Sequence, residues 1–178
     1  MRTTATATAI AVALGAALIG AGGASAASRD WHACSKAATK AAAQQAGLPA
    51  RMDADERLRT VFGGGAPSSV LTTIARSLCA DFDGDGDVDR LAMYACCTVS
   101  SPSPFAILRN NRPGAGYAVA YSRLDDAVFS IRTAGRDLLE RDPRYAAGDA
   151  NCCPSRIRER RIHWSQTRFR TTVRIRLP

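Results

Sequence analysis

The ten residues before the C-terminal proline alternate between two kinds of side chain, and this pattern restricts the local fold more than any other feature. Arg or Thr occupies the even positions from 168 to 176, and apolar residues or Thr occupy the odd positions from 169 to 177. A period of two matches a β-strand and excludes the 3.6-residue period of a helix. The run Arg156–Trp164 is the expected partner, across a turn at Ser165–Thr167. The sequence therefore predicts a C-terminal hairpin over residues 156–178, with the apolar face of its last strand buried.

The positive charge of the chain is concentrated in this hairpin. The whole sequence has 24 basic and 16 acidic side chains, whereas residues 156–178 contain eight arginines and one glutamate. Arginine binds carboxylates and phosphates in a bidentate manner, which favours an anionic cell-wall polymer or an acidic protein as partner. Aromatic residues are too sparse here for single-strand binding, so nucleic acid is not an expected partner. The alternative is a solvated charged face. The candidate anion-binding residues are Arg168, Arg170, Arg174 and Arg176.

The N-terminus has the pattern of a secretory signal. Arg2 is followed by the apolar stretch Ala9–Ile19 and then by small residues that end in Ala24-Ser25-Ala26. Signal peptidase accepts small side chains at this spacing, and the apolar stretch is shorter than the roughly 20 residues that span a bilayer. We expect residues 1–26 to be a signal peptide and the mature chain to be secreted, without a transmembrane segment or a lipid anchor.

Export favours disulfides, because the space outside the cytoplasm is oxidising. Bridges between adjacent cysteines are strained, since consecutive Cα atoms lie about 3.8 Å apart. We therefore expect one bridge between the two adjacent pairs, with the remaining pair members bonded to the two single cysteines. Zinc is disfavoured because the chain has no Cys-x-x-Cys motif. The cysteines are Cys34, Cys79, Cys96, Cys97, Cys152 and Cys153.

Helical patterns precede strand patterns along the chain. The alanine-rich residues 27–50 predict a helix over 35–46, and a short helix is expected over 53–62. A further helix can begin at Pro67, with Val70, Ile74 and Leu78 on one face. The β-branched residues from 70 to 74 leave its end open, and a strand over 78–82 is the alternative there. This order predicts an α+β fold: N-terminal helices followed by an antiparallel sheet of hairpins, stapled by disulfides, with residues 51–178 as the main domain. The strands expected before the final hairpin are 90–96, 105–109, 117–121, 128–132 and 137–141.

The stretch from Asp81 to Asp89 carries an aspartate at every second position. Carboxylates this close repel one another unless a cation lies among them. In calcium loops, side chains at positions 1, 3, 5 and 9 and a carbonyl at position 7 supply the oxygens, and a glycine such as Gly86 permits the sharp turn. Ala92 stands where an EF-hand needs a bidentate glutamate, so an EF-hand is excluded. The alternative is a solvated turn. The candidate ligands of a structural Ca²⁺ are Asp81, Asp83, Asp85, Asp87 and Asp89.

This loop resembles the aspartate-rich hairpin turns of FG-GAP and VCBS-type repeats, in which such a loop binds Ca²⁺ between two strands and has a structural role. The chain also resembles actinobacterial secreted proteins and lipoproteins of unassigned function. These share an Asp- and Gly-rich strand turn, a cysteine after the next strand, a Cys-Cys-Pro-Ser segment and an aromatic hairpin. Here the corresponding segments are 81–89, Cys96-Cys97, 149–155, and 162–164 with Phe169. The wider resemblance implies a small extracytoplasmic domain and no known activity.

The sequence contains no recognisable catalytic motif. It lacks Gly-x-Ser-x-Gly, a phosphate-binding glycine loop and His-Glu-x-x-His, and its only histidines are His32 and His163. We therefore expect an exported, non-enzymatic domain that is stabilised by calcium and binds an anionic partner. Two alternatives stay open: a secreted hydrolase whose site the sequence does not reveal, and a protease inhibitor with an exposed loop at 100–104 or 110–116.

Overall fold

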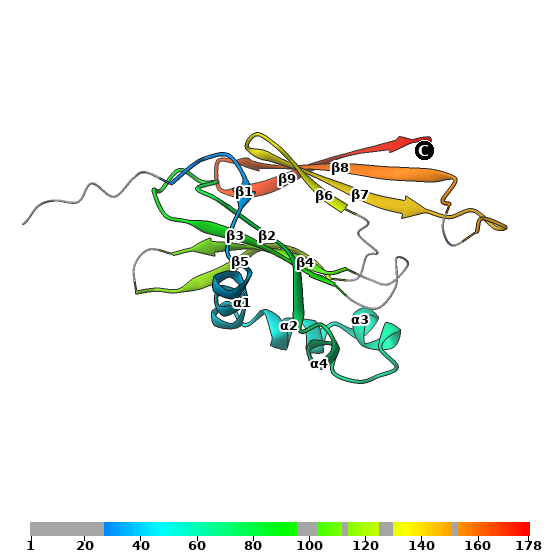
Figure 1. The fold of residues 1–178 in the computed structure, drawn as a ribbon, viewed down its shortest axis with the longest axis horizontal. Coiled ribbons are helices and arrows are strands. Elements are labelled where there is room, and N and C mark those ends of the chain that lie inside the picture. Colours follow the sequence, from blue (N-terminus) through cyan, green and yellow to red (C-terminus); the bar gives the residue numbers. More distant parts are fainter. Residues whose placement is uncertain (1–26, 96–102, 112–113, 125–129, 151–152) are drawn as a thin grey trace, which may run out of the picture.

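The structure is a computed structural model that describes residues 27–95, 103–111, 114–124, 130–150 and 153–178. Its elements form three layers: helices cover one face of a five-stranded sheet, and a four-stranded sheet packs on the other face (Figure 1). All paired strands are antiparallel, which confirms the predicted antiparallel pairing. The predicted signal peptide, residues 1–26, lies outside the described residues.

The five-stranded sheet forms the middle layer and is therefore apolar on both faces. Phe105 and Ile107 pack toward the other sheet, whereas Ala106 and Leu108 pack toward the helices, and all four are fully buried. A strand covered on both faces forms a continuous apolar run rather than an alternating one. In spatial order the strands are β1 (His32–Ala33), β2 (Thr73–Ala80), β3 (Asp89–Ala95), β4 (Phe105–Asn110) and β5 (Tyr117–Arg123).

Short helices lie between β1 and β2, and the longest has ten residues. Ser35 and Asp55 cap two of them, because each side chain accepts a backbone N–H from the first turn. Gly47, at φ 65°, ends the first helix and lets the second begin directly after it. Leu48 and Leu58 are fully buried against the sheet. The helices are α1 (Lys36–Gln45), α2 (Leu48–Ala54), α3 (Glu56–Val61) and α4 (Pro67–Val70).

The helix expected to begin at Pro67 is only one turn long, and the strand offered as the alternative for the end of this stretch begins earlier than residue 78. Helix α4 ends at Val70, and the residues from Thr73 onward form β2. The β-branched residues from 70 to 74 favour a strand, and pairing with β3 supplies the hydrogen bonds that a longer helix would have made. A register shift between Ile74 and Arg76 then turns Ile74 toward the helices and Leu78 toward the second sheet.

The four-stranded sheet contains the predicted C-terminal hairpin. Its last two strands pair along their whole length, with Ile157 opposite Arg176 at one end and Ser165 opposite Arg168 at the other. The turn between them has two residues, and Gln166 in this turn adopts φ 57°. Ile131, Leu138 and Ile162 bury their side chains against the first sheet. In spatial order the strands are β6 (Ser130–Ala134), β7 (Asp137–Arg144), β8 (Arg156–Ser165) and β9 (Arg168–Arg176).

The predicted burial of one face of β9 is wrong for most of the strand. Phe169, near its start, is partly buried and lies 5.8 Å from Tyr121 of β5, between ring centroids. Farther along, the side chains of Val173, Ile175 and Leu177 are 50%, 56% and 80% exposed. The physical reason is position: β9 is the edge strand of its sheet, and only its first residues pack over the first sheet (Figure 1).

The inner face of the second sheet also carries buried ion pairs. Glu140 on β7 is fully buried, and Nη1 of Arg160 on β8 lies 2.5 Å from its Oε1. The guanidinium of Arg123 on β5 approaches the same carboxylate to 4.0 Å from the first sheet. Asp142 and Arg158, the next inward-facing pair along these strands, are also ion-paired. Two arginines of the hairpin therefore neutralise buried acids and are not available to an external ligand.

The disulfide Cys34–Cys79 differs from the predicted pairing, in which each of these cysteines bonds to a member of an adjacent pair. The short strand β1 pairs with β2, with His32 opposite Cys79, and this brings the Cα atoms of the two cysteines to 5.7 Å. Cys153 is also disulfide-bonded. Cys96, Cys97 and Cys152 lie outside the described residues, so the remaining connectivity stays a prediction.

Replacement of Glu140 tests the buried ion pair. In Glu140→Gln, Arg160 keeps its charge in a buried site without its compensating carboxylate, so the free energy of unfolding should fall by about 3 kcal/mol. The matched control is Asp137→Asn, which removes a carboxylate 2.6 Å from the exposed Arg161 of the same sheet and should cost less than about 1 kcal/mol. Urea unfolding measures both, and equal losses would contradict the assigned role of Glu140.

Candidate metal centre and arginine face

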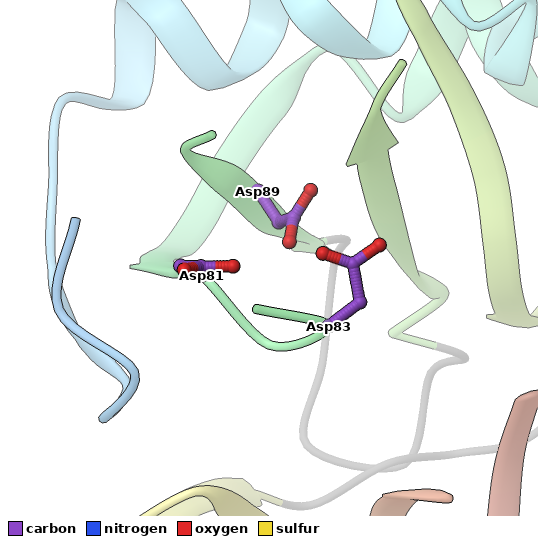
Figure 2. Close-up of side chains that lie close together, drawn as sticks. All are labelled: Asp81, Asp83 and Asp89. Carbon is purple, nitrogen blue, oxygen red and sulfur yellow. The ribbon is translucent and has the colours of Figure 1, made fainter. Parts of the chain in front are cut away.

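Three of the alternating aspartates converge at the turn between β2 and β3. Asp81 follows the last residue of β2, Asp89 is the first residue of β3, and Asp83 lies in the turn between them. Each contributes one carboxylate oxygen, and these oxygens lie within 4.8 Å of one another. Figure 2 shows the carboxylates of Asp83 and Asp89 side by side, with Asp81 facing them across the turn. The arrangement could hold a metal ion.

The backbone of the turn fixes the orientation of the two buried carboxylates. Asp81 accepts hydrogen bonds from the N–H groups of Gly84 at 2.7 Å and Gly86 at 3.2 Å. Both glycines have positive φ, 84° and 93°, which side chains other than glycine rarely tolerate. Asp89 accepts from the N–H groups of Phe82 at 3.2 Å and Asn110 at 2.8 Å. These carboxylates are therefore held in place by the chain itself.

The other two predicted ligands, Asp85 and Asp87, do not join this group. The side chain of Asp85 is 17% exposed, and one of its carboxylate oxygens accepts the N–H of Asp87 at 3.0 Å. The other carboxylate oxygen of Asp85 lies 3.7 Å from the Nη2 atom of Arg109. The structure thus brings together Asp81, Asp83 and Asp89 and leaves the tip of the loop on the outside.

Two arginines that the sequence analysis did not single out lie against the loop. Arg109 on β4 places its Nε atom 2.5 Å from Oδ2 of Asp83. The guanidinium of Arg29 lies directly over Gly84, where a Cβ atom would collide with it. Both belong to segments distant from the loop in the sequence, so only the fold reveals that they offset its negative charge.

Burial raises the pKa of two acids of the cluster, Asp83 and Asp89. Asp89 is fully buried, and the loss of solvation raises its pKa from 3.8 to about 7, against the lowering effect of the hydrogen bond from Asn110. Burial also raises the pKa of Asp83, although the nearby Arg109 opposes that shift. The carboxylates are therefore costly to ionise together, and a bound cation would remove this cost.

The loop is connected to the second sheet through Phe82, which lies between two of the clustered aspartates in the sequence. The ring centroid of Phe82 is 4.8 Å from that of Trp164 on β8 and 4.7 Å from that of Phe169 on β9. It also stacks on Trp31 at 6.2 Å. Phe82 therefore links the loop to the turn end of the C-terminal hairpin.

The four candidate anion-binding arginines lie on the face of β9 opposite this aromatic cluster. Phe169 points inward, so the even-numbered residues of the strand point outward. Nη2 of Arg176 lies 3.1 Å from Oε1 of Glu159. In the part of the chain that the structure describes, no acidic side chain forms an ion pair with Arg168, Arg170 or Arg174. Of these three, Arg174 lines a cavity of about 540 Å³, together with Phe82, Arg136, Asp137, Arg161, His163, Trp164 and Thr172.

No family model, characterised protein or solved structure matches this chain. Over the described ranges, every helix is too short or too polar to cross a membrane.

The buried carboxyl of Asp89 should make the stability of the metal-free protein depend on pH. The folded state retains a proton up to about pH 7, whereas the unfolded state releases it near pH 3.8. The free energy of unfolding should therefore fall as pH rises between these values and level off above them. Urea unfolding in chelator across this range measures the effect. Asp89→Asn should reduce the slope, and an unchanged slope in that variant would contradict the assignment.

Proposed function

We propose that this protein is an exported, non-enzymatic domain that is stabilised by Ca²⁺ and binds an anionic partner through its arginine face. The metal part rests on one observation, the convergence of three carboxylate oxygens within 4.8 Å. Calcium ligands lie at about 2.3–2.6 Å from the ion, so oxygens at these separations can share one. Carboxylates are hard ligands, which favours Ca²⁺ over the softer metals that thiolate and imidazole select.

The kinds of oxygen ligand that the loop offers favour calcium over magnesium. Mg²⁺ requires a near-ideal octahedron of ligands and retains several waters, whereas Ca²⁺ accepts irregular sets of carboxylate and carbonyl oxygens. The turn supplies both kinds of oxygen within nine residues of chain, 81–89. The role we propose is structural, because the ion would join the ends of β2 and β3 and hold Phe82 against the second sheet.

A thermal melt with and without calcium tests the metal assignment. At a calcium concentration about 100 times Kd, binding to the folded state should stabilise it by about 2.7 kcal/mol and raise Tm by roughly 5 °C or more relative to chelator. Asp83→Asn and Asp89→Asn should lose most of this shift. Glu56→Gln, which removes an exposed acid from the first turn of α3, should retain it.

Magnesium at the same concentration is the comparison that tests selectivity. A Tm shift of equal size with Mg²⁺ would contradict calcium preference. No shift with either ion would contradict the metal site and leave Arg29 and Arg109 as the only counter-charges of the loop among the described residues.

The anion-binding part of the proposal rests on the arrangement of arginines on the outer face of the second sheet. Arg168, Arg170 and Arg174 repeat along one side of β9. Charges at such spacing attract polyanions from a distance and bind carboxylates or phosphates at contact. Export supports an envelope or extracellular partner, either an anionic cell-wall polymer or an acidic protein.

Co-sedimentation with purified anionic cell wall tests this surface. Binding of the wild-type protein should weaken steeply as the salt concentration rises past about 0.15 M, since exposed charges are screened. The double variant Arg170→Glu/Arg174→Glu should lose binding. Arg51→Glu, a reversal on an exposed residue of α2, should retain most of it. Equal loss in both variants would show that net charge alone governs the interaction.

A further inference from the structure

Strand β9 leaves one edge of the second sheet open. It is nine residues long and stands last in the strand order β6-β7-β8-β9. Within the described residues it pairs with β8 alone. Its second edge therefore presents a row of backbone N–H and C=O groups without a strand partner, and such an edge is a template for pairing with another chain.

The two faces of this edge strand differ in chemistry, and both are accessible. Val173, Ile175 and Leu177 leave half or more of their side-chain surface exposed on one face. The other face carries arginines at positions 168, 170, 174 and 176 and has no acidic residue of its own strand. An exposed apolar row is unfavourable in water, and it is covered most simply by a ligand that continues the sheet.

We propose that β9 is the docking edge for an extended acidic segment of another protein, in which Asp or Glu alternates with apolar residues. This inference rests on the proposed anion-binding function and narrows the partner to an acidic polypeptide. The segment adds a fifth strand to the sheet. Its backbone pairs with the free edge of β9, its acids lie beside the arginines, and its apolar side chains cover Val173 and Ile175.

A second copy of this chain does not satisfy the same edge. Two β9 strands related by a two-fold axis pair in an antiparallel manner. Because both strands would use the same edge, even positions face even positions and the two arginine rows fall on one side of the sheet. Arg170 would then face Arg174 of the copy, for example, and like charges directly opposite each other are destabilising. Charge complementarity therefore selects a foreign acidic strand.

Fluorescence anisotropy with short peptides tests the pairing. The probe is a labelled peptide of about eight residues in which Glu and Val alternate, and it should bind the oxidised protein. Two control peptides have the same sequence. In each, every second backbone nitrogen is methylated, so that one control is blocked along one edge of the strand and the other control along the opposite edge. Methylation removes donors on the pairing edge and preserves charge, so one of the two methylated peptides should bind at least about tenfold more weakly. Equal binding by all three would overturn edge pairing.

Variants on each face of β9 locate the peptide. Ile175→Thr should weaken binding about two- to fivefold, as should Arg174→Gln, because each removes one cross-strand contact. Val61→Thr is the control for the first variant, since Val61 on α3 is also 56% exposed. Arg51→Gln is the control for the second. All four positions are exposed, so the variants should fold, which circular dichroism would verify.

The cell-wall and peptide experiments together separate anion binding by the arginine face from strand pairing at the edge of β9. If cell wall binds and the alternating peptide does not, the arginine face binds anions but β9 does not accept a strand. If neither binds, both proposals fail. If sedimentation equilibrium shows a dimer that Ile175→Thr dissociates, a second copy occupies the edge and the foreign acidic segment is excluded.

Discussion

The packing of Phe82 between the two sheets is the contact on which the rest of the structure depends. Its ring touches Trp164 and Phe169 of the second sheet, and its neighbours on either side, Asp81 and Asp83, belong to the carboxylate cluster. One residue thus joins the candidate metal centre to the C-terminal hairpin. Because Phe82 is 1% exposed and the acids beside it repel one another, the energy of the cluster and that of the interlayer core are coupled.

The arginines of the second sheet differ in their surroundings according to which face of the sheet they lie on. Where the second sheet faces the first, Arg160 is matched by the buried Glu140, because an unpaired charge in that position would cost several kcal/mol. Where the sheet faces solvent, water screens the arginines of β9 and they need no internal partner. The hairpin can therefore contain eight arginines and still assemble, because its inward arginines are ion-paired with buried acids and its outward ones lie on the solvent-facing side.

The sequence predicted the local elements well and their environments less well. The alternation from residue 168 onward correctly indicated a strand paired with residues 156–164. It did not indicate that the apolar face would be exposed. Alternation shows only that the two faces of a strand differ in polarity, and it does not show whether another element covers either face. Likewise five aspartates marked the loop, but only three converge, and Arg109 joins them from a different strand. Between Pro67 and Leu78 the apolar spacing fits both a helix and a strand, so the sequence left the end of that helix open. Pairing with β3 decided for a strand from Thr73 onward.

By itself, the sequence determined the antiparallel strands, the aspartate-rich turn and the concentration of arginine at the C-terminus, because periodicity, turn chemistry and charge are local properties. Tertiary structure alone decided which strands share a sheet, that Cys34 bonds to Cys79, and that β9 stands at an edge. These outcomes depend on contacts between residues far apart in the chain. The free energy of such contacts comes from burial and pairing in three dimensions, which no short stretch of sequence encodes.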